Sequence, residues 1–96
     1  KGRTKEQDRD ISQGLMDIFA EFGEIRTSDP ASAKAQELVK KLQDYITAHF
    51  YTCTGEILKG LGKMYAGGGD FTKNIDSYGG EGTAEFAHQA IEIYCR

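Results

Sequence analysis

The residues best suited to chemistry are two histidines and two cysteines, namely His49, His88, Cys53 and Cys95. Imidazole and thiolate groups are the ligands that zinc prefers, but this spacing matches no recognised zinc pattern. A histidine beside a cysteine can also activate a nucleophile, yet no acid stands next to this pair to orient the imidazole. We therefore expect no metal site, no cofactor and no enzymatic activity.

Cys53 is notable for its place, because it lies at or just before the N-terminus of a helix predicted to start at Thr54. The dipole of a helix favours a thiolate at this end and can lower the pKa of an exposed cysteine, which makes it nucleophilic. Alternatively, the side chain is a small buried hydrophobe, since free cysteine is among the most buried residue types. Two cysteines make no disulfide framework, so we expect free thiols and leave both roles open.

Aromatic side chains cluster around the same junction and the glycine turn that follows it. Tyrosine combines an apolar ring with a polar tip, so several tyrosines near one crease can line a cavity for a large amphipathic ligand. Ordinary core packing is the alternative. The candidate ligand-binding residues are Phe19, Phe22, Phe50, Tyr51, Cys53, Ile57, Leu61, Tyr65, Phe71 and Tyr78.

The elements that position these residues are predicted to be helices, because apolar residues recur every three or four positions. The first helix is expected over residues 5–25, and Gly14 within it costs up to about 1 kcal/mol relative to alanine. We expect this helix to fray or shorten on its N-terminal side. Its apolar stripe consists of Ile11, Leu15, Ile18, Phe19, Phe22 and Ile25.

A second helix is expected to begin at Pro30, capped by Ser28 or Asp29, and to run to Phe50. Three shorter helices follow between glycine-rich turns, at residues 54–65, 70–78 and 83–94, with Thr54 and Asp70 as candidate caps. No strand alternation, repeat or heptad run is found. The pattern predicts an all-α domain of about five helices.

Composition limits the classes of protein that fit. The chain has 96 residues, of which 39% are hydrophobic, and its net charge is −3, so it reads as one globular domain. Without a basic run it is a poor match for nucleic acid, and no apolar stretch approaches the roughly 20 residues that cross a bilayer. We expect a soluble, cytoplasmic domain, and the start at Lys1 suggests a piece of a longer chain.

Two segments, "FYTCTGEILKGLGKMY" and "DFTKNIDSYGGEGTAEFAHQAIEIY", carry a family resemblance. They resemble the TipAS antibiotic-recognition domain, the C-terminal effector domain of some MerR-type transcription activators. The resemblance extends from about Ser28 to Tyr94. The matching positions are Phe50, Tyr51, Cys53, Met64, Tyr65, Phe71, Asp76, Gly82, Phe86, Ala90 and Ile91.

The resemblance implies a globin-like helical fold without haem, whose ligand cleft is completed by flexible N-terminal helices that order around the drug. In thiopeptide-binding relatives, a cysteine in the region of Cys53 can attack a dehydroamino acid of the antibiotic. Longer relatives carry an N-terminal winged helix-turn-helix that reads DNA and a coiled coil that makes the homodimer. Shorter relatives consist of the binding domain alone and neutralise the drug by sequestering it.

Two classes of function follow. In the first, a hydrophobic antibiotic enters a crease beside the first helix, and ordering of that helix shifts a fused DNA-binding module. In the second, the chain is a protein-interaction or dimerisation module whose apolar stripe of Ile11, Leu15, Phe19 and Phe22 binds a partner helix.

Overall fold

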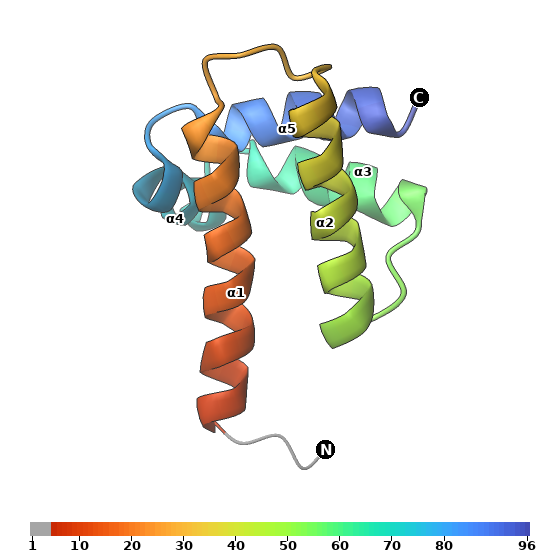
Figure 1. The fold of residues 1–96 in the computed structure, drawn as a ribbon. Helices are drawn as coiled ribbons and strands as arrows, with labels where there is room; N and C mark the ends of the chain where they lie inside the picture. Colours follow the sequence, from red (N-terminus) through yellow and green to blue (C-terminus); the bar gives the residue numbers. More distant parts are fainter. Residues whose placement is uncertain (1–4) are drawn as a thin grey trace.

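The computed structural model describes residues 5–96, with side chains from residue 9 onward, and it contains five helices. They are α1 (Lys5–Glu24), α2 (Ala33–His49), α3 (Gly55–Tyr65), α4 (Asp70–Gly79) and α5 (Thr83–Tyr94). Within the described residues there is no strand, so the all-α prediction is confirmed. Figure 1 shows α1 and α2 running antiparallel, with α3 and α5 crossing their upper ends and the short α4 beside α1.

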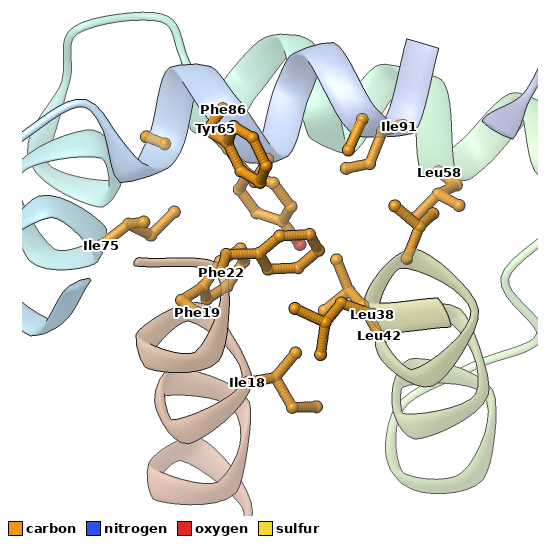
Figure 2. Close-up of a cluster of buried hydrophobic side chains, with 14 of the residues drawn as sticks. Ile18, Phe19, Phe22, Leu38, Leu42, Leu58, Tyr65, Ile75, Phe86 and Ile91 are labelled. Atoms are coloured by element: carbon orange, nitrogen blue, oxygen red, sulfur yellow. The ribbon is translucent and has the colours of Figure 1, made fainter. Parts of the chain in front are cut away.

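The core forms where all five helices meet. Figure 2 shows that side chains from every helix point toward one another there. Phe19 and Phe22 of α1 have no exposed surface, and their rings contact Tyr65 and Phe86 with centroid distances of 5.0 and 6.3 Å. The apolar stripe of α1, from Leu15 to Phe22, is therefore buried in the domain's own core.

Gly23 of α1 and Gly79 of α4 lie in close contact. A Cβ atom at Gly23 would overlap the backbone carbonyl of Gly79. Arg26 then joins the two helix ends, because its guanidinium donates to the carbonyl oxygens of Gly23 at 2.6 Å, Gly79 at 2.8 Å and Glu81 at 3.0 Å. A cation at the C-terminal ends of two helices also complements their dipoles.

Gly14 does not interrupt α1, which differs from the expected fraying. The reason is a contact across the glycine. The Tyr45 hydroxyl of α2 lies where a Cβ at Gly14 would stand, and it donates a hydrogen bond of 2.6 Å to the carbonyl of Ile11. The missing side chain therefore lets α2 pack closely against the N-terminal half of α1.

The start of α2 lies three residues later than predicted. Ser32 is the N-cap, and its hydroxyl accepts from the Ala35 amide at 3.2 Å. Pro30 lies in the preceding turn, where the Asp29 carboxylate accepts from the Ala31 amide at 2.8 Å. The carboxylate stabilises a turn rather than the helix, which is a common competing use of aspartate.

The remaining helix starts are capped in different ways. The prediction for Thr54 is confirmed, because its hydroxyl accepts from the Ile57 amide at 3.2 Å. The prediction for Asp70 is wrong, since it is the first residue of α4 and Gly69 is the N-cap. At α5 the cap comes from another helix, because the Asp76 carboxylate accepts from the Ala84 amide at 2.9 Å.

Candidate functional site

An apolar pocket of about 190 Å³ opens where α1, α2, α3 and α4 meet. Its wall combines one residue of α1, one of α2, two from the following loop, three of α3 and one of α4. The lining residues are Leu15, Ile46, Phe50, Tyr51, Leu61, Met64, Tyr65 and Phe71. None of them carries a charge, so the pocket suits an apolar or aromatic group.

The pocket has a buried floor and an exposed apolar rim. On the floor, Ile46 and Tyr65 retain 3% and 2% of their surface. At the rim, Phe50, Tyr51 and Met64 are 43%, 50% and 46% exposed, which is unusual for such large apolar side chains. A molecule wider than the pocket could therefore keep contacting apolar surface outside it.

The loop between α2 and α3 places the two aromatic rim residues. It is fixed at Cys53, whose amide donates to the Thr47 hydroxyl at 3.1 Å and whose carbonyl accepts from the Gln43 side chain at 2.9 Å. Both partners belong to α2, so the loop is held against the end of that helix. Phe50 and Tyr51 consequently stand at the pocket mouth.

The turn between α3 and α4 positions Tyr65 and Phe71. The Thr72 hydroxyl donates to the carbonyl of Tyr65 and accepts from the Gly68 amide at 2.9 Å, which closes the glycine turn. The rings of Tyr65 and Phe71 then lie 5.2 Å apart between centroids, and the Phe19 ring meets Tyr65 edge-on. Such aromatic contacts stabilise the positions of Tyr65 and Phe71 in the pocket wall.

Cys53 does not have the lowered pKa expected of an exposed thiol at a helix start. It is 4% exposed, lies one residue before the N-cap Thr54, and directs its thiol to the Thr54 carbonyl at 3.9 Å. Burial raises the pKa of the Cys53 thiol, with a smaller effect of the same sign from Cys95. Desolvation of the thiolate therefore outweighs the helix dipole, and the alternative of a buried hydrophobe describes this residue.

The structure brings together five of the ten candidate residues and separates the rest. Phe50, Tyr51, Leu61, Tyr65 and Phe71 line the pocket. Of the remaining candidates, Phe19, Phe22 and Cys53 are buried outside the pocket lining, and Ile57 and Tyr78 are exposed outside it.

Three lining residues were missed as candidates: Leu15, Ile46 and Met64. Periodicity places Leu15 on the apolar stripe of the first expected helix, and Ile46 and Met64 fall within the helices expected after Pro30 and Thr54. Periodicity could not show that a hollow remains between these helices.

A second depression lies along the outer face of α2, and its chemistry is different. It is wide and shallow, with a volume of about 510 Å³, and mixes acids and bases with Tyr45, Ala48 and His49. Lys40 pairs with Asp44 at 3.0 Å and Lys41 with Glu21 at 2.6 Å. These charges already satisfy one another at the surface, so this face offers less to a ligand than the apolar pocket.

Neither metal binding nor membrane insertion is indicated by the described part of the chain. From residue 9 onward, no three His, Cys, Asp or Glu side chains gather closely enough to hold a metal ion. In the same residues, no helix combines the length and the hydropathy needed to cross a bilayer.

Comparison with known proteins agrees with an antibiotic-recognition domain. A protein-family model described as the TipAS antibiotic-recognition domain matches residues 1–94. The HTH-type transcriptional activator mta of Bacillus subtilis (strain 168) is 42% identical over 85 residues, which cover 81% of this chain and 33% of that protein. The chain thus spans about a third of this curated relative, and no solved structure matches it. On the match over nearly its whole length, the chain belongs to the TipAS antibiotic-recognition domain family.

Proposed function

We propose that this chain is the effector-binding domain of a MerR-type transcription activator and that it binds a hydrophobic, thiopeptide-like antibiotic in the apolar pocket. The family is one of ligand recognition rather than catalysis. The observation that carries the proposal is the uncharged pocket with its exposed aromatic rim. The globin-like arrangement that the family implies stays a prediction.

The size of the pocket indicates how such a ligand would bind. Pockets that enclose a whole drug-sized molecule measure roughly 300–1,000 Å³, and this one measures about 190 Å³. A large antibiotic would therefore insert one ring-sized group and lay the rest of its apolar surface over Phe50, Tyr51 and Met64. Affinity would come mainly from apolar area removed from water.

Binding is proposed to be reversible, because the state of Cys53 opposes covalent capture. Its thiol is buried and its pKa is raised, so little thiolate forms near neutral pH. Intact-mass measurement after incubation with thiostrepton tests this, with Cys53→Ala as the comparison. An adduct on the wild-type chain that is lost in Cys53→Ala would contradict reversible binding.

The rim provides a test of the binding site. Met64→Ala removes an exposed apolar side chain from the rim, so it should weaken thiostrepton binding by about 1 kcal/mol, or roughly fivefold. Ile93→Ala truncates a half-buried apolar side chain of α5 outside the pocket and serves as the matched control. Isothermal titration calorimetry gives both affinities. Equal effects of the two substitutions would argue against binding at the pocket.

Coupling to a fused DNA-binding module is proposed to pass through α1. Leu15 of α1 forms one wall of the pocket, and the half of α1 that precedes it extends beyond the α3–α5 layer (Figure 1). A ligand that packs against Leu15 should reduce amide exchange in residues 9–15. Unchanged exchange there at saturating thiostrepton would leave drug sequestration, rather than activation, as the better description of the chain.

Dimerisation through the α1 stripe is the weaker candidate, because Leu15, Phe19 and Phe22 are buried in the domain's own core. In the full regulator, DNA contact and a homodimer are proposed to reside outside this domain, as its relation to a longer activator suggests. Light scattering on the domain distinguishes a dimerisation module from a ligand-binding domain. A tight dimer that does not bind thiostrepton would favour the dimerisation module.

A further inference from the structure

Tyr65 is a hydroxyl-bearing residue in the buried part of the apolar pocket's lining. The side chain lines the pocket, yet only 2% of its surface is exposed. Figure 2 shows the hydroxyl oxygen directed away from α3, toward the space between α1 and α2. Tyr65 thus brings a buried polar group to a lining whose other residues, apart from Tyr51, are apolar.

Within the described residues, this buried hydroxyl forms no hydrogen bond, whereas the hydroxyls of the half-buried Tyr45 and Tyr94 do. Tyr45 donates to the Ile11 carbonyl at 2.6 Å, and the Tyr94 hydroxyl donates to Gln43 at 3.2 Å. No side-chain oxygen that is completely enclosed lacks a partner in residues 9–96. The Tyr65 oxygen must therefore retain some accessible surface.

A polar group in this position has an energetic consequence. Tyr51, which is half exposed, can satisfy its hydroxyl with bulk water, whereas Tyr65 is 2% exposed and belongs to the pocket lining. Covering Tyr65 with a purely apolar ligand would strand a donor, which costs roughly 1–3 kcal/mol in mutational data, or about five- to 150-fold in affinity. A ligand that accepts its hydrogen bond avoids this loss.

The protonation state of Tyr65 fixes the direction of that bond. Burial raises the pKa of the phenol far above its ordinary value, and the nearby Tyr51 and Cys53 act in the same direction. The hydroxyl therefore keeps its proton at any physiological pH and can donate it.

We propose that the pocket selects a neutral, ring-sized group that carries a hydrogen-bond acceptor, and that the Tyr65 hydroxyl donates to that acceptor. The proposal rests on the pocket being the ligand site and specifies the chemistry of the inserted group. A ring fits because an apolar cavity of about 150 Å³ accommodates benzene, and this pocket is slightly larger. The group is uncharged because no lining residue offers a countercharge to a desolvated ion.

Two small probes of the same shape test this. Acetophenone carries a carbonyl acceptor on a ring, and α-methylstyrene replaces that oxygen with a methylene group. Each is titrated into the wild-type chain, Tyr65→Phe and Tyr94→Phe, with the methyl NMR signals of Leu15, Ile46 and Leu61 as the readout. Tyr94→Phe removes a half-buried hydroxyl outside the pocket and is the matched control.

We expect Tyr65→Phe to weaken acetophenone binding roughly three- to tenfold, as for one uncharged hydrogen bond, and not to weaken α-methylstyrene binding. Tyr94→Phe should change neither. Equal weakening of both probes, or of neither, by Tyr65→Phe would overturn the inference while leaving the pocket as the binding site. Failure of both probes to shift the pocket methyls of the wild-type chain would overturn the inference and the proposed site together.

A measurement on the wild-type chain makes the test independent of how the variants fold. The carbonyl stretching band of bound acetophenone should move to lower wavenumber relative to the probe in an apolar solvent, as hydrogen bonding weakens that bond. A band at the apolar-solvent position in the bound state would contradict the proposed donor.

Discussion

Replacing Gly23 by alanine tests how closely α1 and α4 pack. The added methyl group would overlap the Gly79 carbonyl, which is backbone and cannot rotate away. One helix must then shift, and Gly79 has little freedom to yield because it lies against the Thr83 side chain and the Phe19 carbonyl. Strain should therefore outweigh the gain in helix propensity, and Gly23→Ala should lower the stability of the domain.

The magnitude follows from two opposing contributions. Inserting a methyl group into a close-packed site typically costs about 1–3 kcal/mol. Alanine is favoured over glycine inside a helix by up to about 1 kcal/mol, but Gly23 is the penultimate residue of α1, where this gain is smaller. We expect a net loss of about 1–2 kcal/mol, which lowers the Tm of a domain of this size by about 4–16 °C.

Gly60→Ala provides the matched control, because a Cβ there meets no atom within 4 Å and the position is exposed in the middle of α3. The same chemical change should here raise stability by about 0.5–1 kcal/mol. Thermal unfolding followed by circular dichroism measures both variants. If Gly23→Ala proves as stabilising as Gly60→Ala, the close crossing of α1 and α4 is incorrect.

Three further predictions concern other parts of the fold. Arg26→Ala should lower the free energy of unfolding by about 1–2 kcal/mol, because three carbonyl oxygens lose a charged donor at an exposed site. Urea denaturation tests this, and an unchanged midpoint would show that these hydrogen bonds contribute nothing to stability. Above about pH 10 the unfolded chain releases the Tyr65 proton, whereas the folded chain retains it, so the free energy of unfolding should fall as pH rises. Tyr65→Phe should reduce that fall. Equal slopes of unfolding free energy against pH for the two chains would contradict a buried phenol. In a Cys95→Ser background, the reaction of Cys53 with a disulfide reagent should be slower in the folded chain than in urea by a factor of about ten or more. Equal rates would mean that the thiol is accessible in the folded chain.

The sequence predicts the helices better than their ends. Apolar periodicity locates all five because each must bury one face. The α2 start is displaced because Asp29 and Ser32 can both cap, and only the path of the turn decides between them. Gly14 is read as a weak point because its contact with Tyr45 joins residues 31 positions apart, which no local pattern reveals.

The candidate site is predictable in its residue types but not in its boundary. Aromatics at the α2–α3 junction indicate a cavity, and several of them line one. Periodicity cannot separate a side chain on the pocket wall, such as Leu15, from one sealed in the core, such as Phe19, since both lie on the same face of α1. The raised pKa of Cys53 is likewise invisible locally, because desolvation by the rest of the fold causes it.

The central claim is that the apolar pocket among α1, α2, α3 and α4 receives the ligand. Methyl NMR mapping during a thiostrepton titration tests it most directly. We predict that the perturbed methyl groups belong to Leu15, Ile46, Leu61 and Met64. Perturbation centred on Ala48, on the charged outer face of α2, with these four unchanged, would contradict the account.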